Sequence, residues 1–250
     1  MLNLFKIDLS WQQDDIYAFL PIVLSLVFFS IYWFISKSEN IKKWFYLKNE
    51  PDQASVNHIT FNRVTGFVSM GIFPLVICLI FLPGYSLASF GLTWNSETSL
   101  NSLLWTIGLS AVVIPVAYMS AQKPENLVNY PQIRARKWND KTVIINAAGW
   151  ALYLFGYELL FRGVLLFPVA GHLGIWPAIA INIALYAATH IPKGMSETIG
   201  AAPLGLILCI LTLSTGTIWI AFFVHLAMAL TNSFTALKFH PDMKYIRSGK

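Results

Sequence analysis

Long stretches without a charged residue are the feature that most constrains how this 250-residue chain can fold. Five of them lie at Ala18–Ile35, Gly66–Ser96, Leu100–Gln122, Gly163–Ile191 and Thr198–Leu237. A sixth, Thr142–Tyr157, leads directly into Glu158. A helix that crosses a bilayer needs about 20 apolar residues, so each stretch has the length of a membrane span. Only 12% of the residues are charged, which is about half the charged fraction of soluble domains. The sequence therefore predicts an all-α, polytopic membrane bundle.

We expect about seven transmembrane helices, because the last uncharged stretch is divided by the turn signal Ser214-Thr215-Gly216. The expected spans are approximately residues 17–36, 66–84, 100–121, 142–168, 174–190, 198–214 and 217–237. The expected organisation is one bundle in three parts. Residues 1–141 would carry three spans with basic loops and an interfacial segment at Pro124–Lys141, anchored in part by Trp138. Residues 142–237 would form the core that carries the polar motifs, and residues 238–250 would form a tail.

The distribution of Lys and Arg tests this span count. Of the 17 basic residues, 15 fall in the loops and tail on one side of a seven-span arrangement, one falls on the other side, and Arg162 lies within a span. Positive charge gathers on the cytoplasmic face of membrane proteins, so we expect a cytoplasmic C-terminus. The net charge of +5 lies in the loops that flank the spans, which favours contact with anionic lipid headgroups and argues against a nucleic-acid partner.

Ionisable side chains inside the predicted spans are concentrated in the second half of the chain. Glu158 and Arg162 lie four residues apart on the fourth span, His190 ends the fifth, and His225 lies deep in the seventh. A charged residue at the centre of a bilayer helix costs roughly 2.5–3.5 kcal/mol on insertion scales, so such residues mark either a structural ion pair or a polar site. We expect these helices to share one cavity.

The chemistry of this cavity has two readings from the residues alone. In the first, Arg162 does no more than neutralise Glu158 within the helix. In the second, Arg162 holds Glu158 ionised so that the carboxylate ligates a metal or orients a water. Together with His190 and His225, Glu158 offers the ligand types of catalytic zinc. The same groups could also serve as general base and oxyanion donor in a metal-free hydrolase. Glu197 is either a capping acid at the start of the sixth span or a second acid that folds into the cavity.

These residues resemble the motifs of the CPBP intramembrane protease family, which includes the type II CAAX prenyl endopeptidases and bacteriocin-processing or immunity proteins. The family pattern is Glu-Glu-x-x-x-Arg, then Phe-x-x-x-His, then His-x-x-x-Asn. Here Glu158-x-x-x-Arg162 matches the second Glu and the Arg, Tyr186-x-x-x-His190 matches the second motif, and His225 matches the third. The resemblance covers roughly Thr142–Leu237.

Two positions depart from that pattern. Tyr157 occupies the place of the first Glu, which the family uses to activate water, and Ala229 occupies the place of the final Asn. Asn232, one turn beyond Ala229, lies only about 20° from the His225 face of an ideal helix. A phenol has a pKa of about 10 and is a poor base at neutral pH, so Tyr157 would at most donate a hydrogen bond to an oxyanion.

The resemblance implies an intramembrane endopeptidase that hydrolyses a peptide bond of a membrane-associated peptide or lipid-modified protein. We expect Glu158 and His190 at the water, His225 as a second ligand or oxyanion donor, and Arg162 orienting Glu158. Tyr157, Asn232 and Glu197 would be accessory. A zinc ion held by Glu158, His190 and His225 is one version of the mechanism. The expected partners are membrane lipids and the substrate, and the expected location is the inner (plasma) membrane of a bacterium.

Two alternatives stay open. The chain could be a catalytically impaired relative that binds or presents a membrane partner, because Tyr157 and Ala229 replace two family residues. It could also be a small-solute or proton carrier, because acids and histidines within a membrane often mark such pathways.

Overall fold

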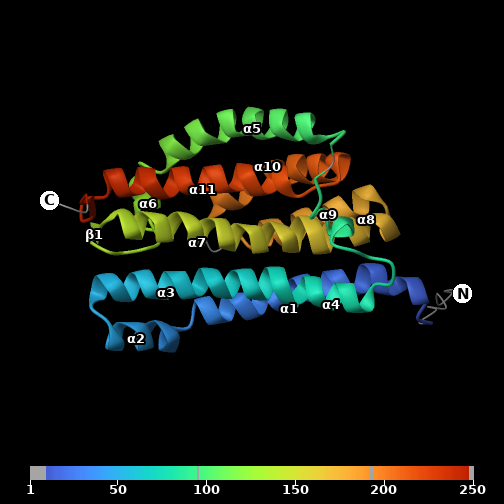
Figure 1. Cartoon of the computed structure of the whole chain (residues 1–250), viewed down its shortest axis with the longest axis horizontal. Coiled ribbons are helices and arrows are strands. Elements are labelled where there is room, and N and C mark those ends of the chain that lie inside the picture. The colour runs from blue at the N-terminus through green and yellow to red at the C-terminus, as the bar shows by residue number, and fades with distance from the viewer. Residues whose placement is uncertain (1–9, 95, 192–193, 248–250) are drawn as a thin grey trace, which may run out of the picture.

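The computed structural model describes residues 10–94, 96–191 and 194–247, and its long helices run along one common axis (Figure 1). The helices are α1 (Ile16–Ser36), α2 (Glu39–Lys48), α3 (Pro51–Gly66), α4 (Phe73–Phe81), α5 (Ser99–Ser120), α6 (Pro124–Leu127), α7 (Asp140–Glu158), α8 (Phe167–Leu173), α9 (Ile175–Ala188), α10 (Met195–Thr215) and α11 (Trp219–Phe239). Two π-helical segments, η2 (Phe67–Ile72) and η4 (Leu159–Leu166), join α3 to α4 and α7 to α8. Short 3-10 turns form η1 (Gln13–Asp15) and η3 (Ala88–Phe90).

Six helices of the described chain are long and apolar enough to cross a membrane. They are Gln13–Ser36, Pro51–Phe81, Ser99–Ser120, Asp140–Leu173, Thr198–Thr215 and Trp219–Phe239. The predicted all-helical membrane fold is thereby confirmed. α9 has only 14 residues, or about 21 Å of helix, so a count of seven full spans stays a prediction, as does the side on which the C-terminus lies.

α7 lies at the centre of the bundle (Figure 1). It packs against α3 and η2 on one side and against α11 on the other, while α5 covers the outer side of α11. The approach between α7 and η2 is close because Gly156 has no side chain: a Cβ atom there would lie 2.7 Å from the Cα atom of Phe67. The polar motifs on α7 and α11 are therefore held in the middle of the protein.

The C-terminal half of the segment expected at the membrane interface packs onto the protein. Strand β1 (Lys137–Trp138) pairs in parallel with β2 (Lys244–Tyr245), and Trp138 and Ile133 are fully buried. The side chains of Trp138 and Ile133 pack with Val56 of α3 in one apolar cluster. The expectation that Trp138 anchors in lipid headgroups is wrong, because its ring is enclosed by protein.

Arg63 also differs from expectation. It is one of the 15 basic residues expected in the loops and tail, but it lies within the long helix Pro51–Phe81 and is only 3% exposed. Its guanidinium donates to the carbonyl and the side-chain oxygen of Asn146, at 2.8 and 3.0 Å, and lies 4.4 Å from the ring centre of Trp150. Polar acceptors and an aromatic face on α7 thus replace water around this cation.

Candidate active site

Glu158 and Arg162 lie where α7 passes into the π-helical segment η4. Both side chains are completely buried, and Arg162 Nε lies 3.5 Å from Glu158 Oε2. The i, i+4 spacing predicted contact on one helix face, and the contact is present despite the wider π-helical turn. π-helical segments within α-helices are frequent at functional sites, because they change the direction of the side chains that follow.

The other carboxylate oxygen of Glu158 faces α11. Glu158 Oε1 lies 2.7 Å from Nδ1 of His225, a residue 67 positions further along the chain. The carboxylate beside Arg162 accepts, so the Nδ1–H of the imidazole donates this hydrogen bond. The side chain of His225 is 10% exposed, whereas that of Glu158 has no exposed surface. The histidine is therefore the member of this pair that retains some accessible surface.

His190 comes into the same region because α9 is short. Its helix ends at Ala188, two residues before His190. The hydroxyl of Tyr157 lies 2.8 Å from Thr189 Oγ1, next to His190 in sequence. His190 Nδ1 lies 3.0 Å from the carbonyl oxygen of Tyr186, which holds the ring against α9.

Arg162 is enclosed by groups from two other helices, α9 and α10. Its Nη1 donates to the side-chain oxygen of Asn182 on α9 and lies 3.6 Å from Sγ of Cys209 on α10. Its guanidinium carbon lies 4.7 Å from the ring centre of Tyr186. These contacts fix the guanidinium, so Arg162 presents a rigid positive group to Glu158.

Sequence reasoning missed two contributors. Thr189 bonds the Tyr157 hydroxyl and lies 3.2 Å from His190 Nδ1, and only its position directly before His190 hinted at this. Cys209 lies within an apolar helix, yet it accepts from Arg162 and donates to Asn182 at 3.3 Å. A single cysteine within an apolar helix carries no signal for such a role.

The predicted accessory residues are placed differently. Tyr157 is 4% exposed and its ring lies edge-on to His225, with 5.7 Å between the ring centres. Asn232 is partly buried, and its side chain forms no hydrogen bond with another described residue. The side chain of Glu197 lies outside the described part of the chain. Tyr157 is therefore the accessory residue that the structure brings to the site.

The side chains at the site that could bind a metal ion are engaged with other groups. Glu158 Oε1 and His225 Nδ1 bond each other, and His190 Nδ1 faces a carbonyl oxygen. Within the described residues, no group of three or more His, Cys, Asp or Glu side chains could hold a metal. The side chains as placed do not fit a zinc site, so we derive no step through zinc, which stays a prediction from the sequence.

Comparison with known proteins identifies the part of the chain that carries this site. Residues 139–231 match the family model described as Type II CAAX prenyl endopeptidase Rce1-like. This segment begins at the N-cap of α7 and includes Glu158, Arg162, His190 and His225, and the match confirms the family resemblance. No curated protein and no solved structure matches the chain. With its six long apolar helices, the chain is an integral, multi-pass membrane protein with protease-like features.

Proposed function

We propose, from the match of residues 139–231 to the Rce1-like endopeptidases, that this chain hydrolyses a peptide bond of a membrane-associated peptide or lipid-modified protein. The observation that supports the proposal most strongly is the 2.7 Å contact between Glu158 Oε1 and His225 Nδ1. A location in the inner membrane of a bacterium is part of the same proposal.

His225 acts as the general base in this proposal. Its Nδ1–H is held by Glu158, so its Nε2 carries the free lone pair, and its side chain is the exposed member of the pair. A water on Nε2 gives its proton to the imidazole as its oxygen attacks the substrate carbonyl. The same proton then passes to the departing amide nitrogen, so the C–N bond breaks and a carboxylic acid and an amine leave.

Glu158 acts through His225 rather than on the water. Its carboxylate fixes the tautomer of His225 and stabilises the imidazolium that forms when the base takes the proton. Arg162, whose Nε lies 3.5 Å from Glu158 Oε2, places a positive charge beside that carboxylate. This differs from the expectation that Glu158 itself meets the water, and the reason is the full burial of its side chain.

The test is cleavage of membrane-tethered peptides by the purified full chain in lipid nanodiscs. The parent protein is expected to cleave, and His225→Ala to lower the rate by about 10²–10⁴-fold, the usual contribution of a general base. His172→Ala is the matched control, because His172 is exposed at the end of α8 and should leave the rate unchanged. Full activity in His225→Ala would contradict the proposal.

A second candidate is a non-catalytic relative that binds a membrane partner. It is favoured by Tyr157, whose hydroxyl is engaged with Thr189 and whose ring packs 4.7 Å from that of Phe161. Tyr157 occupies the position at which the family has its water-activating Glu, and its phenol ring is packed against other side chains. If the parent is inactive and Tyr157→Glu with Ala229→Asn creates cleavage, the second candidate is correct.

A further inference from the structure

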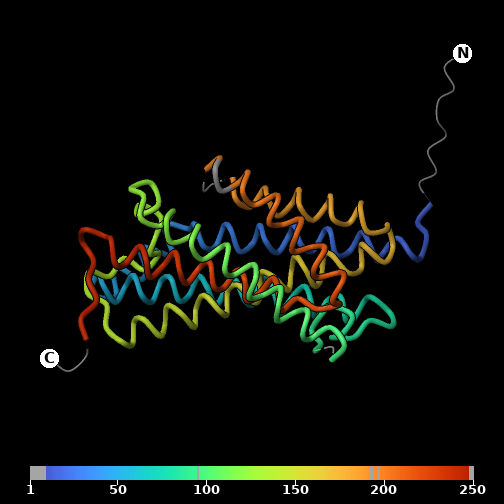
Figure 2. Tube along the Cα trace, turned by 90° about the horizontal axis from the view of Figure 1, so that it is seen from above, coloured from blue at the N-terminus to red at the C-terminus, as the bar shows by residue number. Residues whose placement is uncertain are grey.

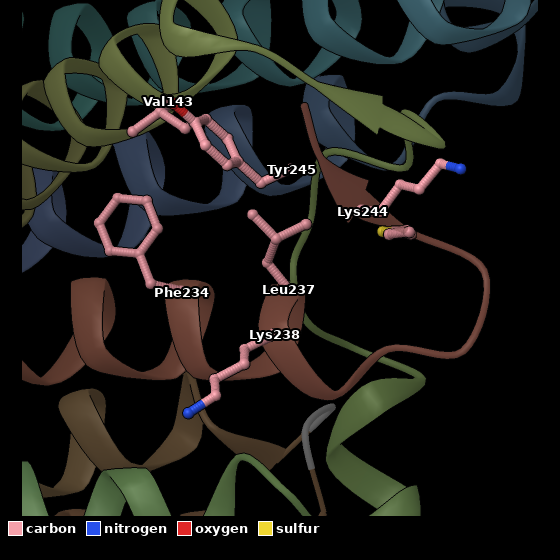
Figure 3. Close-up of a pocket in the computed structure, with 7 residues that line it drawn as sticks. Val143, Phe234, Leu237, Lys238, Lys244 and Tyr245 are labelled. Atoms are coloured by element: carbon pink, nitrogen blue, oxygen red, sulfur yellow. The ribbon is translucent and has the colours of Figure 1, made fainter. Parts of the chain in front are cut away.

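An apolar cavity with a basic rim lies at the end of the bundle where α11 ends (Figure 3). Its volume is about 380 Å³. The walls are Val143 of α7, Phe234 and Leu237 of α11, and Met243 of the segment after α11. The cavity is therefore built from the two helices that carry Glu158 and His225, closed by the C-terminal segment.

Two lysines stand on opposite sides of this cavity. Lys238 extends from the last turn of α11 and Lys244 from strand β2, and both side chains are exposed (Figure 3). Neither lysine forms an ion pair with an acid in the described part of the chain. The carboxylate of Asp140 is engaged by the hydroxyl of Tyr245 on the cavity wall. Among the described residues, the ammonium groups of the two rim lysines are therefore not paired with a carboxylate.

The position of the cavity decides which ligand suits it. α11 is long and apolar enough to span a membrane and ends at Phe239, so the cavity lies at the level where a span meets the lipid headgroups. Basic pockets between transmembrane helices at this level bind acidic lipid headgroups. Lysine side chains extend along apolar surface toward such headgroups and keep the ammonium outside it.

We propose that this cavity binds an anionic phospholipid. Its glyceride portion packs against Phe234, Leu237 and Val143, and its phosphate lies within reach of Lys238 and Lys244. A soluble acidic peptide would satisfy the two lysines but would leave the apolar walls exposed. A neutral lipid would fill the walls but gain nothing from the lysines. Binding there ties β2 to the ends of α7 and α11, and it requires no proteolytic activity.

The test is thermal unfolding of the detergent-purified full chain, titrated with phosphatidylglycerol or phosphatidylcholine. Phosphatidylglycerol is expected to raise the midpoint, and phosphatidylcholine to raise it far less. The variant Lys238→Gln/Lys244→Gln should weaken the apparent phosphatidylglycerol affinity by about 30-fold, from roughly fivefold for each lysine near a membrane surface. The control Lys43→Gln/Lys123→Gln removes the same charge from exposed positions at the same end of the bundle and should keep the affinity.

A second variant probes the apolar walls. Val143→Trp places a large ring in the cavity and should weaken phosphatidylglycerol binding while both lysines remain. Equal effects of the two lipids, or equal losses in the lysine variant and its control, would overturn the proposal. So would a full midpoint rise with glycerol phosphate, which lacks acyl chains. A rise with polyglutamate but none with phosphatidylglycerol would mean a peptide site, and would overturn it as well.

Discussion

Glu158 Oε1 lies 2.7 Å from Nδ1 of His225, and this contact joins the last residue of α7 to the first half of α11. Figure 2, which turns the bundle by 90°, shows α7 and α11 running along the same length of the protein. The hydrogen bond pairs a fully buried carboxylate with a histidine that is 10% exposed. In the proposed mechanism the fully buried glutamate orients the histidine, and the histidine binds the water.

Removing Arg162 alone should destabilise the protein strongly. Arg162→Met leaves the Glu158 carboxylate buried without its cation, and breaking a buried pair in this way costs about 3–5 kcal/mol. The double variant Glu158→Leu/Arg162→Met should recover much of that loss, because no uncompensated charge remains. Urea unfolding in mixed micelles measures the free energy of unfolding of both variants. A double variant less stable than Arg162→Met would contradict the ion-pair account.

The crossing of α7 with η2 should depend on Gly156. A Cβ atom there would lie 2.7 Å from the Cα and 3.1 Å from the carbonyl oxygen of Phe67, and backbone cannot move aside easily. Gly156→Ala should lower the free energy of unfolding by about 1–3 kcal/mol through overpacking. Gly108→Ala is the control, because Gly108 is exposed on α5 with open space around it. The control should be neutral or stabilising, as alanine favours helices.

The burial of Arg63 should depend on Asn146. Asn146→Leu removes one acceptor at 3.0 Å and leaves a fully buried guanidinium nitrogen without that partner. A loss of about 1–3 kcal/mol is expected, with a charged donor at the upper end. Asn101→Leu on the exposed face of α5 is the matched control and should change stability little. Equal effects in the two variants would show that the Arg63 contact contributes nothing.

The hydroxyl of Tyr157 should matter for packing more than for catalysis. Tyr157→Phe removes the 2.8 Å bond to Thr189 and should cost about 1 kcal/mol of stability. The cleavage rate should change by less than about tenfold, because that hydroxyl is already engaged with Thr189. A loss of about 10²–10³-fold at unchanged stability would instead mark Tyr157 as an oxyanion donor.

The fold could be predicted well because membrane spans are encoded by composition. Runs without charge gave the positions of the long helices to within a few residues in most cases. The helix Pro51–Phe81 is the main exception: it begins about 15 residues before the expected span at residue 66. The sequence did not indicate the first half of this helix, because Arg63 and its polar neighbours interrupt the apolar run. The buried guanidinium of Arg63 donates to Asn146 on another helix, and no local sequence pattern reveals such a partner.

The sequence indicated which residues belong to the candidate site, but not which of them contact each other. Ionisable residues within apolar runs identified Glu158, Arg162, His190 and His225. Which histidine meets the carboxylate depends on the length of α9 and on the π-helical turn after Glu158, and both arise from packing. The sequence therefore placed Glu158 with His190 at the water, whereas the structure bonds Glu158 to His225.

The most direct measurement of the central claim is a double-mutant cycle in the peptide-cleavage assay with Glu158→Gln, His225→Ala and the double variant. If Glu158 acts only through His225, the double variant should be no slower than His225→Ala, because residues that work as one unit are strongly non-additive. If the two losses multiply in the double variant, Glu158 acts independently of His225, and the paired mechanism is contradicted.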